Sequence, residues 1–458
     1  MNLPVSAESR GPSEPIQSRE YKFPAAKHAG SLSCASASCH GGSDSVRAGS
    51  EYTTWVNSDP HFRAYVILLD PPSRKIAENL KLSRPAHESE LCLKCHAPSA
   101  IPVHVSPLDR PVLPGVGCEQ CHGPAEKYLS SHYQNDFKKL TRSEKADAYG
   151  LFPTKDLAFR VSMCASCHVG DESREVNHDM IAAGHPRLAF EYTGYHHSKK
   201  YKRHWEESEY GPDFDARAWE IGQVASARAA VALTGIRAER AKARLAQWPE
   251  LSEYSCYSCH KDLKPGESWK PFVESARPPG AMPWGTWYFS TADLATADPD
   301  AFQRAGAEIM RLMEAPAKDS THTAERCKKL AEKLDSRLNH LQNLADADSK
   351  MRPYDAAYLE RSFSLITRHA LTSDGTKFRD LDWDGATQHY LAAAAQYYSL
   401  GEVNATSRNP RVREPLVELG SLLEFPKMYN SPKGRDPAQI LRLFQQLRTD
   451  TSDPHGTR

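Results

Sequence analysis

Ten of the eleven cysteines in this chain belong to five short motifs, and each motif ends in a histidine. Four motifs, at residues 92–96, 118–122, 164–168 and 256–260, read Cys-x-x-Cys-His, and a stretched version with four residues between its cysteines occupies residues 34–40. The regular spacing is typical of covalent c-type haem attachment. The two thiols form thioethers with the porphyrin, and the adjacent histidine binds the iron. The sequence therefore predicts five c-type haems and electron chemistry at iron.

The motifs assign a role to each of their cysteines and histidines. The predicted attachment cysteines are Cys34, Cys39, Cys92, Cys95, Cys118, Cys121, Cys164, Cys167, Cys256 and Cys259, and the predicted first iron ligands are His40, His96, His122, His168 and His260. In the stretched motif the extra residues must bulge out between thioether positions that the macrocycle holds fixed. Whether that motif forms two thioethers or contains a pair of ordinary cysteines is therefore left open. The eleventh cysteine, Cys327, lies at helical spacing with leucines and is expected to pack in a core.

Paired cysteines can also bind zinc or form disulfides. A zinc ribbon places two Cys-x-x-Cys pairs about 15–20 residues apart, and 22 residues separate Cys95 from Cys118. Zinc does not require a histidine directly after the second cysteine, yet that histidine follows in all five motifs. Disulfide frameworks are typical of short secreted chains, whereas this chain has 458 residues. The histidine after each motif therefore favours haem over zinc, and the length of the chain favours haem over a disulfide framework.

Composition limits the class of protein. The mass of 51.1 kDa allows two or three domains, and the mean hydropathy of −0.62 is low for this size. Bound haems would supply apolar surface that side chains otherwise provide. The 58 basic and 58 acidic residues balance, which does not favour nucleic acid as a partner. We expect the partners to be redox proteins that donate and accept electrons.

The expected location is the periplasm or another extracytoplasmic space, because c-type haems are attached outside the bacterial cytoplasm. No apolar run reaches the 18–20 residues of a transmembrane helix. Residues 1–30 lack the apolar segment of a signal peptide, so we expect that an export signal has been removed or truncated. Residues 1–30 are expected to form a flexible tail.

The histidines divide the rest of the chain into two parts. Fifteen of the twenty lie in residues 1–262, so we expect a pentahaem domain of short helices and loops at residues 31–268. Apolar periodicity beyond it predicts a haem-free α-helical bundle at residues 269–458, with helices from 298, across 327–344, and near 354–370, 384–400 and 436–448. A long helix is expected at 215–247, and Asp59-Pro60 is expected to start a helix that carries His61. The fold class is mainly α.

Ten histidines of the first part lie outside the motifs, enough to give every iron a second histidine. They are His28, His61, His87, His104, His132, His178, His185, His196, His197 and His204. His178 and His185 flank a short apolar segment and are candidate distal ligands, His28 is a further candidate, and Met180 is an alternative that would raise the potential. His196, His197 and His204 lie in a Lys- and Arg-rich stretch, which indicates a solvated face or a group that neutralises propionates.

The first four motifs and their surroundings resemble the nitrifier tetrahaem cytochrome c family that takes electrons from hydroxylamine oxidoreductase. The similar segments are Trp55-Val-Asn-Ser-Asp-Pro-His-Phe-Arg-Ala64, Gly115-Val-Gly-Cys-Glu-Gln-Cys-His-Gly-Pro124 and Cys164-Ala-Ser-Cys-His168, with His132 ten residues after the third motif histidine. The resemblance covers residues 31–190. The stretched first motif departs from the family pattern, and the fifth motif and the C-terminal helices lie outside it.

The resemblance implies further properties. His61 and His132 are implied as distal ligands by matching position. The second and third motifs are implied to hold a stacked haem pair, and the haem on His96 is implied to lack a distal protein ligand.

Three functions follow as hypotheses. The first is a multihaem electron carrier with mostly bis-His haems. The second is an enzyme that uses an open iron at the His96 haem for redox chemistry of a small nitrogen compound. The third is an electron-relay subunit of a homo-oligomer or larger complex, docked through the C-terminal helices. Whether the chain is an enzyme is left undecided, with electron transfer favoured.

Overall fold

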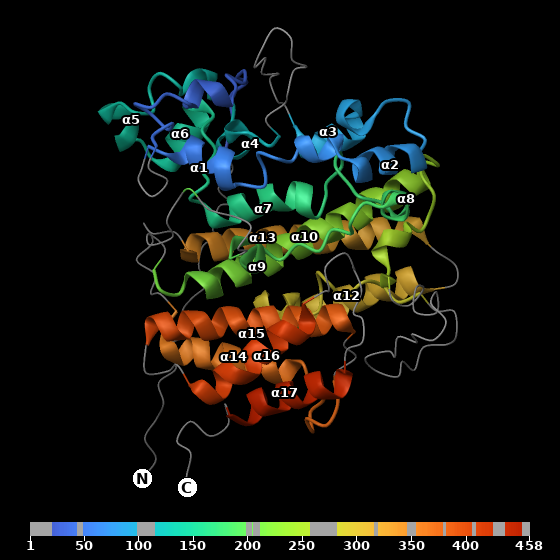
Figure 1. The fold of residues 1–458 in the computed structure, drawn as a ribbon. Coiled ribbons are helices and arrows are strands. Elements are labelled where there is room, and N and C mark those ends of the chain that lie inside the picture. The colour runs from blue at the N-terminus through green and yellow to red at the C-terminus, as the bar shows by residue number, and fades with distance from the viewer. Residues whose placement is uncertain are drawn as a thin grey trace.

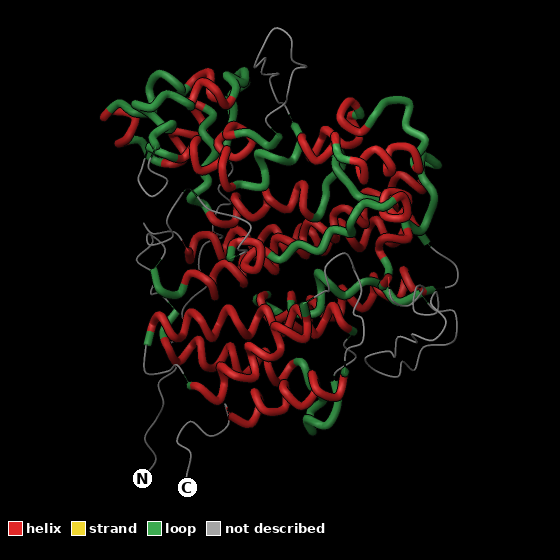
Figure 2. The backbone as a smooth tube through the Cα atoms, viewed as in Figure 1, coloured by secondary structure: helices red, strands yellow, loops and turns green. Residues whose placement is uncertain are grey.

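Helices dominate the part of the chain that can be described. The computed structural model describes residues 21–43, 49–98, 115–197, 204, 211–256, 282–315, 319–345, 354–378, 382–404, 409–424 and 436–450. Within these ranges the only β-pairings are two isolated bridges, Tyr254 with Trp284 and Leu371 with Phe378, and Figure 2 shows helices and loops throughout. The predicted mainly-α fold class is therefore confirmed.

The helices form three layers (Figure 1). The upper layer consists of short helices and turns: α1 (Glu51–Ser58), α2 (Pro71–Asn79), α3 (Glu90–His96), α4 (Cys118–His122), α5 (Asn135–Lys139) and α6 (Arg142–Tyr149). The middle layer contains α7 (Leu157–His168), α8 (His178–Ala183), α9 (Tyr192–His196), α10 (Phe214–Lys242) and α13 (Ser320–Ala345). The lower layer contains α12 (Pro299–Glu314), α14 (Ala356–His369), α15 (Trp383–Val403), α16 (Pro410–Leu423) and α17 (Pro437–Asp450).

Most of the helices expected from periodicity are present at nearly the expected bounds. The helix expected at 215–247 is α10, which ends earlier, at Lys242, and is followed by Arg244 in a left-handed conformation with φ 57°. The sequence does not predict α16, because its interior Pro415 interrupts the pattern of a continuous helix.

The expected helix start at Asp59-Pro60 is wrong. Asp59 instead follows the last residue of α1, and its amide donates to the Trp55 carbonyl as the C-cap of that helix. The Asp59 side chain accepts from the backbone amide of His61 at 2.9 Å, which closes a local turn. Aspartate side chains stabilise such turns as readily as helix starts.

One core joins the middle layer with α12 of the lower layer. The helices α10 and α13 lie side by side, and α7 and α12 pack against them. Their shared cluster includes Val161, Val224, Ile309 and Leu334, all almost fully buried. Cys327 belongs to the same cluster with no exposed surface, so its predicted role in the core is confirmed. The cluster contains residues from both expected domains, and the expected boundary at 268/269 lies outside the described residues.

Buried ion pairs supplement this core. Glu220 of α10 accepts a hydrogen bond from Arg337 of α13 at 2.7 Å and another from the Tyr354 hydroxyl.

A second core, in the lower layer, packs Phe363, Trp383, Leu419 and Phe444 together. In the described ranges no helix has the length and apolar character needed to cross a membrane.

Truncation of Leu334 tests the shared core. Leu334→Ala should lower the free energy of unfolding by about 2–5 kcal/mol, because it leaves a cavity among α7, α10 and α13. Since these helices share one cluster, amide hydrogen exchange should accelerate in α7 and α13 together. Lys333→Ala, at an exposed neighbouring position, should change stability by less than about 0.5 kcal/mol. Faster exchange in α13 with unchanged protection in α7 would contradict a shared core.

Candidate metal centres

The described motifs occupy helix ends and turns of the upper and middle layers. The second and third motifs form α3 and α4, and the fourth closes α7. The first motif follows the 3-10 turn Ser31–Cys34. Of the fifth motif only Cys256 is described, where it is half-buried, and Cys259 and His260 lie outside the described residues.

Each of the four described motif histidines faces a second histidine. The ring centroids are separated by 6.1 Å for His40 and His132, 6.4 Å for His96 and His185, 6.3 Å for His122 and His204, and 6.1 Å for His168 and His61. We name these pairs site 1, site 2, site 3 and site 4, in the order of their motifs. Two imidazole nitrogens that bind one metal from opposite sides, each at about 2 Å, place their ring centroids about 6 Å apart. The pairs therefore have the spacing of two axial ligands on one iron.

Hydrogen bonds at Nδ1 orient several of these rings. Carboxylates accept from two of them, since His40 lies 2.9 Å from Glu51 Oε2 and His61 lies 2.9 Å from Asp59 Oδ1. Three more rings donate to backbone carbonyls: His96 to that of Ala64 at 2.8 Å, His132 to that of Leu129 at 3.0 Å, and His185 to that of Pro186 at 2.7 Å. A partner at Nδ1 fixes the tautomer and leaves Nε2 as the ligand nitrogen.

Burial favours the neutral form of His122, His168 and His185. It lowers the pKa of His122 and that of His168 to about 4, and neighbouring histidines add to both effects. Burial also lowers the pKa of His185. A neutral imidazole is the form that binds a metal, so these sites are prepared for ligation over the ordinary pH range.

The side chains do not converge as they would around a structural zinc ion. Structural zinc takes four Cys or His ligands around a single point. Within the described ranges no group of three or more His, Cys, Asp or Glu side chains is arranged to hold a metal ion. Opposed imidazole pairs beside two thiols instead fit haem, because the porphyrin itself supplies the other four ligands of the iron.

Contacts between thiols show which motifs are neighbours. A hydrogen bond between Cys34 and Cys118 lowers the pKa of Cys34 to about 6 and raises that of Cys118, which joins sites 1 and 3. A similar hydrogen bond between Cys95 and Cys167 joins sites 2 and 4. These contacts join the first motif with the third and the second with the fourth, and the stacked haem pair implied for the second and third motifs stays a prediction.

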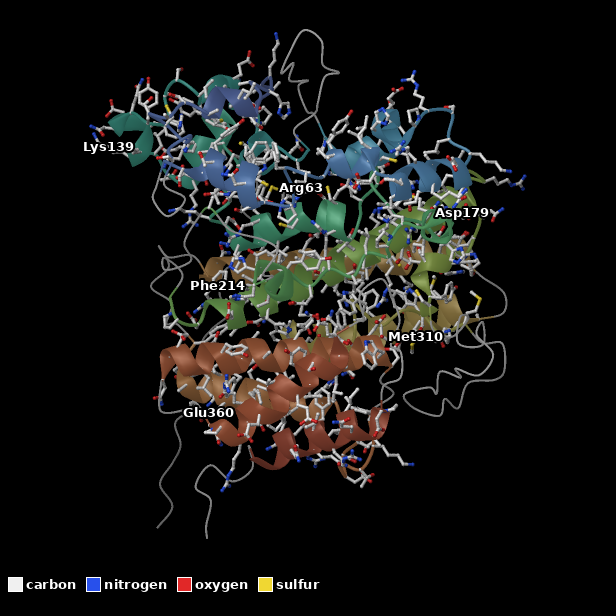
Figure 3. All side chains as sticks on the ribbon, in the orientation of Figure 1. Arg63, Lys139, Asp179, Phe214, Met310 and Glu360 are labelled. Atoms are coloured by element: carbon white, nitrogen blue, oxygen red, sulfur yellow. The ribbon has the colours of Figure 1, made fainter. Side chains whose placement is uncertain are left out.

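Sites 3 and 4 are also close, and α8 connects site 2 with the segment that precedes Cys256. Burial, together with the charges of Cys164, Asp59 and Cys167, raises the pKa of Cys121 to about 12, and Cys164 and Cys167 belong to the fourth motif. The helix α8 begins at His178, whose amide donates to Glu250 Oε1 at 2.7 Å, and ends one residue before Gly184-His185. Asp179 in α8 lies across the upper part of the molecule from Lys139 in α5 (Figure 3). The four described motifs thus follow one another in the order first, third, fourth and second.

A buried carboxylate inside the third motif brings sites 1 and 3 together. Glu119 accepts hydrogen bonds from the amides of Ala29, Gly30 and Ala125 at 2.8, 2.7 and 2.7 Å. The segment that leads into the first motif is thereby tied to α4. The Ser31 hydroxyl adds a further link, since it accepts from the Cys118 amide at 3.2 Å.

The turn that carries His61 packs against the start of the third motif. Trp55 Nε1 donates to the Val116 carbonyl at 3.1 Å, and the Val116 amide donates to the His61 carbonyl at 3.0 Å. Gly115 has φ +67°, and a Cβ there would lie 2.3 Å from the His61 carbonyl oxygen. Only glycine fits this approach, so the glycine positions the turn that holds His61 at site 4.

The structure places the remaining candidates in different surroundings. His28 lies with its Nδ1 3.8 Å from Glu119 Oε2 and is about a quarter exposed. Met180 is buried in α8. His178 lies at the start of α8, close to the turn Leu251–Glu253 that precedes Cys256, so its expected partnership with the fifth motif stays a prediction.

The sequence did not predict that His204 lies opposite His122. The Lys- and Arg-rich stretch around it indicates a solvated face or a group that neutralises propionates; the solvated face is wrong for His196 and His204, and the other interpretation stays a prediction. His204 faces His122, and His196 is 3% exposed between Tyr192 and Phe214. His197 does lie at the surface, where it pairs with Asp215 at 2.7 Å. No local signal distinguishes His204, because its partner is eighty-two residues away in the chain.

Comparison with known proteins gives a match to a family model. A family model described as "Cytochrome c554 and c-prime" matches residues 33–123, which include the first three motifs. No curated protein and no solved structure matches the chain at a significant level. The family match supports a c-type cytochrome with covalently bound haem and iron, and with it a role in electron transfer.

Gly115→Ala tests the packing that positions His61. The left-handed conformation costs a residue with a Cβ about 1–2 kcal/mol, and the contact with the His61 carbonyl adds to it. We expect a lower melting temperature. Gly306→Ala in α12 is the matched control, since a Cβ there meets nothing within 4 Å, and it should stabilise the helix by about 0.5–1 kcal/mol. Equal effects of the two substitutions on thermal unfolding would contradict this packing.

Proposed function

We propose that this chain is a pentahaem c-type cytochrome that relays electrons between redox partner proteins. The observation that carries the proposal is the set of four histidine pairs, each with ring centroids 6.1–6.4 Å apart. In this proposal the ten motif cysteines hold five haems. The second axial ligands are His132 at site 1, His185 at site 2, His204 at site 3, His61 at site 4 and His178 at the fifth motif.

The cofactor supplies the electron chemistry: when bound, each haem contributes an iron that gains and loses one electron. The chain would hold an imidazole on each side of every iron. Glu51 accepts from Nδ1 of His40 and Asp59 accepts from Nδ1 of His61; a carboxylate in this position makes a metal-bound imidazole a stronger electron donor, which favours the oxidised metal. The expected effect is a lower potential at sites 1 and 4 than neutral partners would give.

The order of the motifs supports a relay. The thiol contacts between sites 1 and 3 and between sites 2 and 4, together with the proximity of sites 3 and 4, form a continuous series. The fifth motif extends this series through α8. Electrons entering at either end of the upper layer would have a path across the molecule, and donor and acceptor proteins would dock near those ends. A match to c-type cytochromes is consistent with an extracytoplasmic location.

The catalytic alternative is less well supported. It requires an open iron at the His96 haem, as the resemblance to the tetrahaem family implies. In this chain His185 lies across from His96, at 6.4 Å between ring centroids. An iron bound by both His96 and His185 would have no position for a substrate, so we favour the relay. Docking through the C-terminal helices remains part of the proposal for an assembled complex.

Carbon monoxide binding tests the ligation. The anaerobically reduced holoprotein should show no shift of the Soret band on addition of carbon monoxide, because every iron has two protein ligands. Mass spectrometry should give the mass of five haems added to the chain. A shift of about one-fifth of the Soret signal would indicate one open iron and would favour the catalytic alternative.

Single substitutions test each assignment. His61→Ala, His132→Ala, His185→Ala and His204→Ala should each make about one haem per chain reactive to carbon monoxide. His28→Ala is the matched control and should leave all haems unreactive, since His28 lies beside Glu119. Unreactive haems in His204→Ala would overturn the assignment of His204 at site 3. A reactive haem in His28→Ala would show that His28 is a ligand and would overturn the proposed set of second ligands.

A further inference from the structure

An extended segment connects two of the proposed centres with the lower layer. We define the strap as residues 185–190, which follow α8, precede α9 and have no regular secondary structure. At one end of the strap His185 faces His96 of site 2. At the other end Phe190 stacks on His168 of site 4, with ring centroids 5.3 Å apart and planes at 24°.

The centre of the strap is held by an ion pair with the C-terminal part of the chain. Arg187 donates two hydrogen bonds to Asp384, at 2.7 and 2.6 Å. Both side chains are nearly buried, with 13% and 4% exposed. A bidentate pair of this kind fixes orientation as well as distance. The Arg187 guanidinium also lies over the Trp287 ring, 5.6 Å from its centroid.

Side chains of residues 286–288 complete the attachment of the strap to the C-terminal part of the chain. Trp287 Nε1 donates to the Phe190 carbonyl at 2.9 Å, and the Tyr288 hydroxyl donates to the Leu188 carbonyl at 3.3 Å. The neighbouring Thr286 hydroxyl donates to Asp382 at 2.6 Å. Asp382 caps α15, where it accepts from the Gly385 amide at 2.9 Å. The N-terminal end of α15 therefore anchors both the strap and the loop that lies against it.

An irregular segment takes its position from such anchors, because it has no hydrogen-bond ladder of its own. Arg187 is two residues from His185, so movement of Arg187 would carry the imidazole away from site 2. The opposing His96 is fixed separately by its own helix α3 and by the Ala64 carbonyl. The anchor at α15 thus acts on His185 and not on His96.

We propose that the Arg187–Asp384 ion pair, together with the contacts of Trp287 and Tyr288, makes the C-terminal helical part a clamp that keeps His185 on the site 2 iron. Arg187 and Asp384 are positioning residues, since they act through the strap. The haem-free helices thereby decide whether the His96 haem is closed or open to an added ligand. This inference rests on the proposed function, because it requires a haem between His96 and His185.

The clamp is tested by breaking the ion pair in the holoprotein and adding carbon monoxide after reduction. Asp384→Asn keeps the shape of the side chain and removes its charge, so the strap should loosen and carbon monoxide should bind to about one haem per chain. Added imidazole should restore the low-spin spectrum by filling the vacated position. Glu220→Gln is the matched control, because it breaks a comparably buried arginine pair between α10 and α13 that does not touch the strap. It should lower stability and leave every haem unreactive.

Two further variants separate the outcomes. If Asp384→Asn does not fold, Arg187→Lys keeps the positive charge, loses the bidentate geometry and should give partial carbon monoxide binding at one haem. Unreactive haems in the folded ion-pair variants, with a reactive haem in His185→Ala, would overturn the clamp and leave the proposed function intact. Unreactive haems in His185→Ala itself would overturn the assignment of site 2. Carbon monoxide binding in Glu220→Gln equal to that in Asp384→Asn would reduce the clamp to general destabilisation and overturn it.

Discussion

Two imidazole rings must be held about 6 Å apart on opposite sides of one iron, and most of the upper half of this molecule depends on that requirement. Side chains alone pack poorly there. The apolar clusters of the upper layer are small, such as Tyr65 with Leu68 and Ala86, whereas the middle and lower layers have extensive cores. The haems would therefore supply much of the apolar interior of the upper layer. The polypeptide contributes mainly the directions from which the histidines approach.

Those directions are set by a few buried polar contacts and close backbone approaches. Glu119 ties the first motif to the third, Gly115 admits the turn that carries His61, and Asp384 holds the strap that carries His185. Each lies far along the chain from the histidine or motif that it positions. The long pair of helices α10 and α13 gives these contacts a rigid support, because α7 closes at the fourth motif while packing against both. The haem-free half is in this view part of the machinery that maintains ligation.

The sequence predicted what local spacing determines and missed what distant contacts determine. The motifs and the long helices α10 and α13 follow from local patterns, and so does the buried position of Cys327. The pairing of His122 with His204 cannot be read from the chain, since a basic stretch hides the second histidine. Asp59-Pro60 has the residues of a helix start, yet Asp59 ends α1 because its side chain is used by the amide and ring of His61. The joining of the first motif with the third depends on Glu119, whose three amide donors lie in two separate segments.

The most direct test of this account is a crystal structure of the holoprotein with anomalous scattering measured at the iron edge. The account predicts one iron between the facing Nε2 atoms of each pair: His40 with His132, His96 with His185, His122 with His204, and His168 with His61. A fifth iron should lie at the motif that contains Cys256. An iron with water or another side chain in place of the assigned second histidine, at any of the four described sites, would contradict the paired-imidazole arrangement on which the relay depends.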